Sequence, residues 1–311
     1  MPLTLSILYR GPLSSCNYDC AYCPFAKHRE TAEELERDRA ALDRFTTWIE
    51  RRPEGDRFRI LFTPWGEALV RKWYQDGLAR LTELPQVERA AIQTNLSCGL
   101  DWVERCDLNK LALWTTFHPS QIGREKFLQR CLELTRRGVR YSVGVVGLRE
   151  HFADIAALRS ELPAEVYLWV NAYKDLPDYY LQDEAAWLAK IDPLFPTNNT
   201  RHPSCGRPCR TGQEVISVDG DGTIRRCHFV KEPLGNLFEP GIEALLQPRL
   251  CPNATCGCHI GYVHLPELGL DETFGDGVLE RVPDAPLQWT IERRGTGRLP
   301  LSISTIASGG K

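Results

Sequence analysis

The sequence lacks the features that would place it at a membrane, outside the cell or on nucleic acid. No apolar run approaches the ~20 residues that a membrane-spanning helix needs. Residues 1–10 have no basic segment followed by a long apolar core, as a secretory signal would. The formal net charge is only -3, and basic runs such as Arg51-Arg52 are short. We therefore predict a cytoplasmic protein that binds neither a membrane nor nucleic acid.

Cysteine departs from an otherwise ordinary composition. The 311 residues are 42% apolar and 25% charged, as in a globular protein with one large domain and one small one. The chain has twelve cysteines, and nine of them fall in two groups. Because disulfides are disfavoured in the cytoplasm, grouped cysteines there indicate metal binding. The scattered Cys98, Cys106 and Cys131 are expected to pack in the core.

The first group contains three cysteines on a short segment and no fourth. Cys16, Cys20 and Cys23 have the spacing C-x3-C-x2-C, and the next cysteine is Cys98. A structural zinc site closes its shell with four ligands, and a cubane iron–sulfur cluster normally takes four thiolates. Three thiolates leave one metal position open for chemistry. The alternatives are a zinc knuckle or chance thiols.

This loop resembles the signature of the radical S-adenosylmethionine (SAM) superfamily. The resemblance implies that the three cysteines hold three irons of a [4Fe–4S] cluster, while SAM chelates the fourth. It also implies reductive cleavage of SAM to a 5'-deoxyadenosyl radical, which takes a hydrogen atom from the substrate. A reductant such as flavodoxin or ferredoxin would supply the electron.

The first two-thirds of the chain alternates strand-like and helix-like patterns. Short apolar runs, rich in β-branched and aromatic residues, predict strands at residues 3–9, 58–63, 89–94, 111–117, 139–146 and 166–172. Amphipathic patterns predict helices at residues 31–52, 68–84, 121–137 and 151–162, the third stopped by Gly138. Six units of ~31 residues need ~190, which predicts an α/β fold with a partial (βα)6 TIM-like barrel. A doubly wound sheet is the alternative, but no G-x-G-x-x-G follows the first strand.

Functional groups of such barrels lie at the carboxyl ends of the strands. Thr63-Pro64-Trp65-Gly66-Glu67 resembles the family's Gly-Gly-Glu motif, with Trp65 in place of the first glycine. The segment 143–150 resembles its G-x-I-x-G-x-x-E motif, with Val143 in place of the first glycine. Together, position and resemblance imply that SAM is bound by Tyr22, Gly66, Glu67, Asn95, Thr116, His118 and Gly147.

Structural alternatives remain open for these residues. Glu67 is also favourable at a helix N-terminus. Asn95 could bond substrate, SAM or the next turn. A lone histidine such as His118 is usually bonded within a loop, so a structural role is the alternative to a SAM contact.

The second group of cysteines is predicted to hold an auxiliary metal site. Strand-like residues 214–218 and 223–227 flank the turn 219–222, which predicts a β-hairpin. Cys209, then Gly222 after twelve residues and Cys227 after four more, resembles the SPASM or shorter twitch extension of the superfamily. The six candidate ligands are Cys205, Cys209, Cys227, Cys251, Cys256 and Cys258.

Six thiolates suffice for one auxiliary [4Fe–4S] cluster but not for two. Cys209 and Cys227 are the firmest ligands, and two of the other four complete the set, with His259 as a remote substitute. The alternative is a zinc site, because four thiolates also make a zinc ribbon.

The domain prediction follows these groups. Residues 1–195 form the barrel, residues 196–262 the cysteine-rich hairpin module after a proline-rich linker, and residues 263–311 a tail packing on the barrel that frays at 307–311. The leading hypothesis is a radical SAM oxidoreductase, or an enzyme that modifies a peptide or small molecule. The alternatives are radical group transfer, such as sulfur insertion, and a non-catalytic metal-binding protein.

Overall fold

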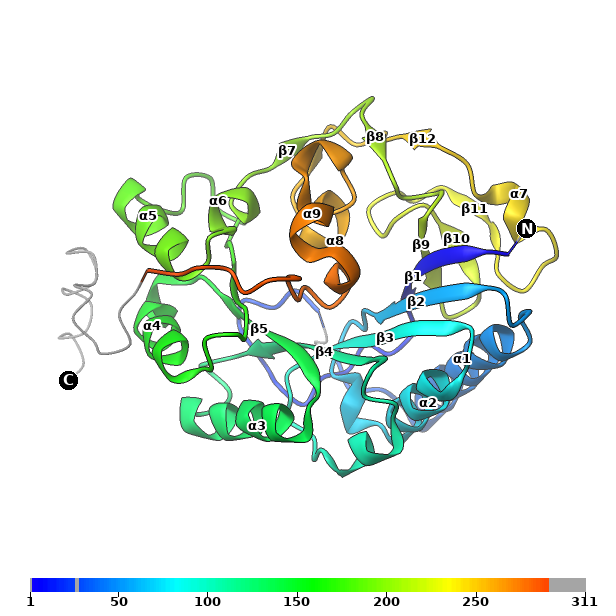
Figure 1. The fold of residues 1–311 in the computed structure, drawn as a ribbon, viewed down its shortest axis with the longest axis horizontal. Helices are drawn as coiled ribbons and strands as arrows, with labels where there is room; N and C mark the ends of the chain where they lie inside the picture. Colours follow the sequence, from blue (N-terminus) through cyan, green and yellow to red (C-terminus); the bar gives the residue numbers. More distant parts are fainter. Residues whose placement is uncertain (1, 26–27, 291–311) are drawn as a thin grey trace.

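A single curved sheet forms the centre of the molecule (Figure 1). The computed structural model describes residues 2–25 and 28–290 of the 311-residue chain. The strand order is β11-β10-β9-β1-β2-β3-β4-β5-β6, and β1 to β6 all run parallel to their neighbours. The strands are β1 (Thr4–Arg10), β2 (Arg57–Phe62), β3 (Val87–Thr94), β4 (Leu111–Phe117), β5 (Arg140–Val146), β6 (Leu168–Asn171), β9 (Val215–Asp219), β10 (Thr223–Arg225) and β11 (Pro233–Asn236).

Helices cover the convex side of this sheet, and short helices near the end of the chain occupy its concave side (Figure 1). The outer helices α1, α2, α3 and α4 follow the strands as crossovers, whereas α8 and α9 lie inside the curve. The helices are α1 (Ala32–Glu50), α2 (Lys72–Glu83), α3 (Arg124–Arg137), α4 (Phe152–Glu161), α5 (Gln182–Ile191), α6 (Phe195–Asn198), α7 (Ile242–Leu245), α8 (His259–Tyr262) and α9 (Leu270–Phe274). Short 3₁₀ helices are η1 (Ala68–Val70), η2 (Asp101–Arg105), η3 (Arg149–His151), η4 (Pro266–Leu268) and η5 (Gly275–Gly277).

Local signals explain where the outer helices begin and end. Thr31 caps α1 by accepting from the Glu34 N–H, and the Glu34 side chain accepts in return from the Thr31 N–H, so two backbone donors are satisfied. Gly138 ends α3 in the left-handed region at φ 74°, after cations in the last turn. That stop at Gly138 was predicted from the sequence and is confirmed.

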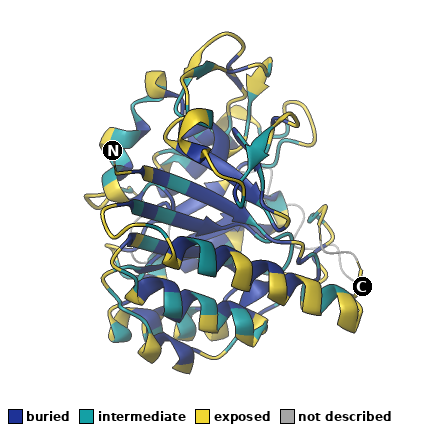
Figure 2. Ribbon diagram, turned by 90° about the vertical axis from the view of Figure 1, so that its right-hand side faces the viewer, coloured by how far each residue is buried: buried dark blue, intermediate teal, exposed yellow. Residues whose placement is uncertain are grey.

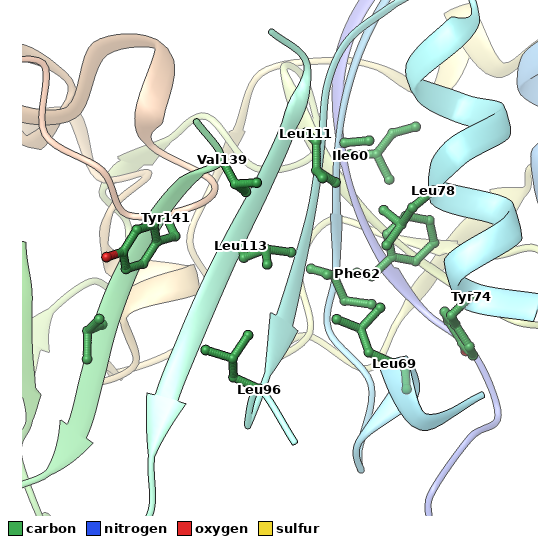
Figure 3. Close-up of a cluster of buried hydrophobic side chains, with 14 of the residues drawn as sticks. Ile60, Phe62, Leu69, Tyr74, Leu78, Leu96, Leu111, Leu113, Val139 and Tyr141 are labelled. Atoms are coloured by element: carbon green, nitrogen blue, oxygen red, sulfur yellow. The ribbon is translucent and has the colours of Figure 1, made fainter. Parts of the chain in front are cut away.

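Both faces of the sheet are buried (Figure 2). Successive side chains of a strand point to opposite faces, so each strand contributes to both sides of the core. Ile7 and Ile60 belong to the outer cluster against the helices, while Leu8 and Leu61 belong to the inner one. The outer cluster between α2 and the strands is drawn in Figure 3. The inner cluster joins the sheet to the end of the chain through Val263, Leu265, Leu270, Phe274 and Leu279. Residues 263–279 therefore fill the interior of the curved sheet.

The predicted order of six parallel strands is confirmed, with β4 at the predicted bounds and no other strand end shifted by more than two residues. The barrel is not closed, since β6 and β11 are the edges of the sheet in the described part of the chain. The predicted hairpin of β9 and β10 is present, and it continues the same sheet because β9 pairs in parallel with β1.

Two features differ from expectation. Helix α5 was not predicted, and the stretch interpreted as a linker holds α6 and short strands. The small strands make two separate pairs, β12–β8 and β13–β7: β7 (His202–Pro203), β8 (Pro208–Cys209), β12 (Arg249–Leu250) and β13 (Thr255–Cys256). The expectation for residues 307–311 lies outside the described residues. None of the helices described here is both long and apolar enough to cross a bilayer.

Candidate active site

A cavity of about 460 Å³ lies at the carboxyl ends of the parallel strands. One wall carries Cys16, Cys20 and Cys23, on the loop that follows β1. Another is made by residues at the ends of β2, β3 and β4, and residues 258–260 and Arg281 form a third. The topology explains this convergence, because the carboxyl ends of parallel strands meet at one edge of the sheet.

The three-cysteine loop is held against the end of β3. The Tyr18 N–H donates to Cys16 Sγ at 3.4 Å, and Asn95 Nδ2 lies 3.8 Å from the same sulfur. The Cys23 N–H donates to the Cys20 carbonyl at 3.1 Å. None of the cysteines in residues 2–25 and 28–290 is in a disulfide. Three thiol groups on one cavity wall fit a cluster that takes three thiolates and leaves one iron open.

Gly66 lies directly against this loop. A Cβ at position 66 would sit 1.7 Å from the Ser15 carbonyl oxygen, so only glycine allows the approach. The neighbouring Glu67 N–H donates to the same oxygen at 3.1 Å. The glycine of the motif therefore has a physical role in seating the cysteine loop on the end of β2.

Glu67 is buried on the cavity wall, and its carboxylate joins the start of η1 to the end of β3. Its carboxylate accepts from Thr94 Oγ1 at 2.8 Å, from the Leu69 N–H at 3.1 Å and from the Asn95 N–H. Burial raises the pKa of Glu67 to about 7, although these hydrogen bonds favour the charged form. Glu67 also caps η1, as the alternative of a helix N-terminus predicts.

His118, after β4, is a neutral histidine beside the first cysteine group. Its Nδ1 lies 2.8 Å from Tyr22 Oη and 3.4 Å from Cys20 Sγ. Burial, together with the nearby His151, lowers the pKa of His118 to about 4. Tyr22 thus orients the His118 ring, and the two rings are nearly parallel, with their centroids 6.1 Å apart.

The structure brings together most of the residues expected to bind SAM. Gly66, Glu67, Asn95, Thr116 and His118 line the cavity, whereas Tyr22 and Gly147 are not among its lining residues in the described part of the chain. A Cβ at Gly147 would lie 2.8 Å from Tyr180 Oη, and its N–H donates to the Asn171 carbonyl at 2.9 Å. Packing between β5 and β6 accounts for this glycine.

The second group of cysteines gathers around Cys227. Burial raises the pKa of Cys227 to about 11, and the adjacent thiols of Cys209 and Cys251 act in the same direction. Burial likewise raises the pKa of Cys256 to about 12, with Cys227, Cys258 and Cys251 as charged neighbours. Cys205 is exposed and is not among these neighbours. Five thiols thus lie near one another, with Cys258 included through its neighbour Cys256.

Cys258 and His259 also line the cavity that the first cysteine group faces. His259 is buried against Trp114, Tyr262 and Phe274, and its Nε2 has no hydrogen-bond partner in the part of the chain that the structure describes. Within the described residues, no three His, Cys, Asp or Glu side chains are arranged around a single metal ion. A cubane attaches each thiolate to a different iron, so that arrangement is not the one it requires.

Several lining residues were not identified from the sequence. Arg10 stacks on Trp65, with its guanidinium carbon 3.9 Å from the ring centroid, and Trp114, Trp169 and Arg281 lie deeper. Period-two alternation along β4 places Trp114 on the same face as Thr116, which is a usable signal. Arg281 follows no strand or motif, so no pattern in the sequence indicates it.

Comparisons with known proteins show a shared fold. No protein-family model matches the chain, and no curated protein matches its sequence. The structure of anSMEcpe with bound AdoMet and Kp18Cys peptide matches with a TM-score of 0.52 at 13% identity, over 78% of this chain and 80% of that one.

Two further structures complete the comparison. Native anSMEcpe with bound AdoMet gives a TM-score of 0.50 at 16% identity, over 78% of this chain and 83% of that one. BtrN in complex with AdoMet and 2-DOIA matches over 94% of this chain and 98% of that one at 18% identity, but with a TM-score of only 0.33. At these identities the chain is shown to share the open α/β fold of anSMEcpe.

Proposed function

We propose that this protein is a radical SAM enzyme that acts on a peptide or a small molecule. The observation that carries the proposal is the convergence of Cys16, Cys20 and Cys23 with strand-end polar residues on one cavity of about 460 Å³. The cysteine spacing and the strand-end positions are independent features of the sequence, and chance thiols would have no reason to face that cavity. The fold shared with anSMEcpe, whose structures hold AdoMet, supports the same assignment.

In this proposal Cys16, Cys20 and Cys23 hold a [4Fe–4S] cluster and SAM completes its coordination. When bound, the cluster supplies the electron that cleaves SAM and yields the 5'-deoxyadenosyl radical. Gly66 seats the loop, and Glu67, Asn95, Thr116 and His118 supply the polar contacts to SAM. Tyr22 keeps His118 in place, and burial keeps that imidazole uncharged. A flavodoxin or ferredoxin serves as reductant.

The second group holds one auxiliary [4Fe–4S] cluster in this proposal. Cys209 and Cys227 remain the firmest ligands, and Cys251 and Cys256 complete the set because their thiols neighbour Cys227. Cys205 is exposed and Cys258 faces the cavity, so both are left out. The auxiliary cluster then acts as an electron acceptor or substrate anchor, and the reaction is an oxidation or another modification of the substrate.

The test is reductive SAM cleavage by the anaerobically reconstituted full chain. With dithionite and SAM, we expect 5'-deoxyadenosine and methionine to form slowly even without substrate. The matched control is Cys106→Ala, which removes a half-buried thiol that packs on the core and does not line the cavity. If the wild type forms no 5'-deoxyadenosine while its iron is fully loaded, the proposed function is wrong.

A further inference from the structure

Arg281 is a buried cation whose donors have no partner among the residues that the structure describes. Its side chain is only 1% exposed, yet it lines the cavity. Its Nε has no hydrogen-bond partner, and within residues 2–25 and 28–290 no ion pair or hydrogen bond is found for its guanidinium. An unpaired buried charge is costly, so a protein that keeps one has a use for it.

Two tryptophan rings hold the Arg281 side chain in place. Its guanidinium carbon lies 4.5 Å from the centroid of Trp169 and 5.8 Å from that of Trp114. Trp169 Nε1 donates to Ser142 Oγ at 3.2 Å, and Gly144 leaves it room, because a Cβ at position 144 would lie 1.9 Å from its ring. The rings fix the arginine through cation–π contact without using its N–H donors.

A second buried arginine shows what a purely structural role looks like. Arg159 is also 1% exposed, and it lies over Trp289 with its guanidinium carbon 4.6 Å from the ring centroid. Its partners include the carbonyls of Val166, Leu162 and Pro163, at 2.7 to 3.3 Å. Arg159 thus ties a loop together, whereas no described carbonyl contacts the Arg281 guanidinium in this way.

The nearest buried carboxylate does not neutralise Arg281. Burial raises the pKa of Asp192, and the positive charge of Arg281 lowers it by less. The two side chains nevertheless form no ion pair. The Asp192 oxygens instead accept from Tyr167 Oη at 2.7 Å and from the N–H groups of Val170 at 2.8 Å and Leu194 at 2.9 Å. The remaining open direction for the guanidinium is the cavity.

We propose that Arg281 binds an oxyanion of the substrate, either a carboxylate or a phosphate. The inference rests on the proposed function, since it assigns the substrate of the same cavity. A guanidinium presents paired N–H donors that match both groups, and such bonds are strongest in a water-poor site. Among the described lining residues the cations are Arg10 and Arg281, and the carboxyl is the raised-pKa Glu67. The cavity is therefore complementary to an anion.

The depth of Arg281 favours the substrate over SAM. Trp114, one of the two rings that contact Arg281, lies two residues before Thr116 on the same face of β4. Two residues of a strand span about 7 Å along its axis. The residues proposed to hold SAM lie at the strand ends, above this level. A neighbouring cavity of about 480 Å³ shares Arg10, Trp65 and His228 and adds Arg225 and Lys231. A basic approach of this kind suits an anionic molecule.

The test is anion binding by the reconstituted, SAM-loaded full chain, followed by tryptophan fluorescence. Acetate and inorganic phosphate are the probes, and acetamide is the neutral control. We expect a saturable signal with one of the two anions, which identifies the group, and none with acetamide. Arg281→Met should weaken that binding about 10- to 100-fold, and Arg281→Lys should restore part of it. Iron content and SAM affinity should stay at wild-type values in both variants.

Stability separates binding from structure. Arg281→Met should keep or raise the unfolding midpoint, because it removes an unpaired buried charge and keeps the packing on the rings. Arg159→Met should lower the midpoint, because it leaves three carbonyls without their donor. The inference is overturned if neither anion binds the wild type, or if Arg281→Met destabilises the protein as Arg159→Met does.

Loss of iron in Arg281→Met would mean that the arginine stabilises the charge of a cluster near Cys258. Loss of SAM affinity would mean that it binds SAM. Either result also overturns the inference. None of these measurements requires catalysis. If the protein binds the anion but does not cleave SAM, the proposed function is wrong and the anion site at Arg281 still stands.

Discussion

The two groups of cysteines are built in opposite ways. Cys16, Cys20 and Cys23 lie within one short loop after β1, and all three face the cavity at the strand ends. Cys209, Cys227, Cys251 and Cys256 come from separate short elements, and their thiols neighbour one another. The first set is local and is proposed to leave one iron open, so we call it the open group; the second is assembled by tertiary structure and is proposed to ligate every iron, so we call it the closed group. An open iron position suits radical generation, whereas a fully ligated cluster suits electron transfer.

The largest expected effect removes the open group. Replacing Cys16, Cys20 and Cys23 together by Ala should abolish 5'-deoxyadenosine formation, since no other described thiols line the cavity except Cys258. The assay is 5'-deoxyadenosine release by chromatography, with Cys106→Ala as control. Residual cleavage in the triple variant would mean that SAM is activated elsewhere and that the open group is not the radical site.

The next prediction removes one ligand of the closed group. Cys209→Ala or Cys227→Ala should abolish substrate turnover while uncoupled SAM cleavage persists, because the amino-terminal loop does not use these thiols. The exposed Cys205 provides the matched control, and Cys205→Ala should retain turnover. A concurrent loss of folding stability in Cys227→Ala, with zinc bound in the wild type, would favour a structural zinc site instead.

A smaller effect is expected from a substitution at Gly66, which lies between the end of β2 and the open group. Gly66→Ala should shift the cysteine loop, because a Cβ 1.7 Å from the Ser15 carbonyl oxygen cannot be accommodated. We expect a loss of about 1–3 kcal/mol in unfolding free energy and weaker iron retention in that loop. Gly123→Ala is the control, since an added Cβ there meets open space. Equal iron retention in the two variants would contradict this packing argument.

Glu67 should make the stability of the protein depend on pH. Burial raises the pKa of Glu67 from its ordinary value of 4.5 to about 7, so the folded state holds this proton more tightly than the unfolded state. Its contribution to stability is therefore fully present below pH 4.5 and is lost as the pH rises to about 7. The loss amounts to about 3 kcal/mol at most.

Denaturant unfolding across this range should show that loss in the wild type and not in Glu67→Gln. Exposed Glu125→Gln should behave as the wild type does. The variant Glu67→Gln should also bind SAM more weakly, and unchanged SAM affinity would leave Glu67 as the cap of η1 alone.

The same contrast explains how far the sequence could predict the molecule. Six strands, their parallel order and the open cysteine loop follow from patterns contained in short stretches, and Gly138 ends its helix as expected. The parallel pairing of β9 with β1 was not predicted, because it joins segments about two hundred residues apart and leaves no periodic signal. Arg281 was missed for the same reason: its role depends on Trp114 and Trp169, on two other strands.

The most direct test of the two-group account is the metal content of three anaerobically reconstituted proteins. The wild type should hold about eight irons and eight sulfides per chain, as two [4Fe–4S] clusters. The triple variant of Cys16, Cys20 and Cys23 should hold about four, and so should Cys209→Ala. A wild type that holds only zinc would contradict the whole account, and a wild-type iron count in Cys209→Ala would contradict the auxiliary cluster at its firmest ligand.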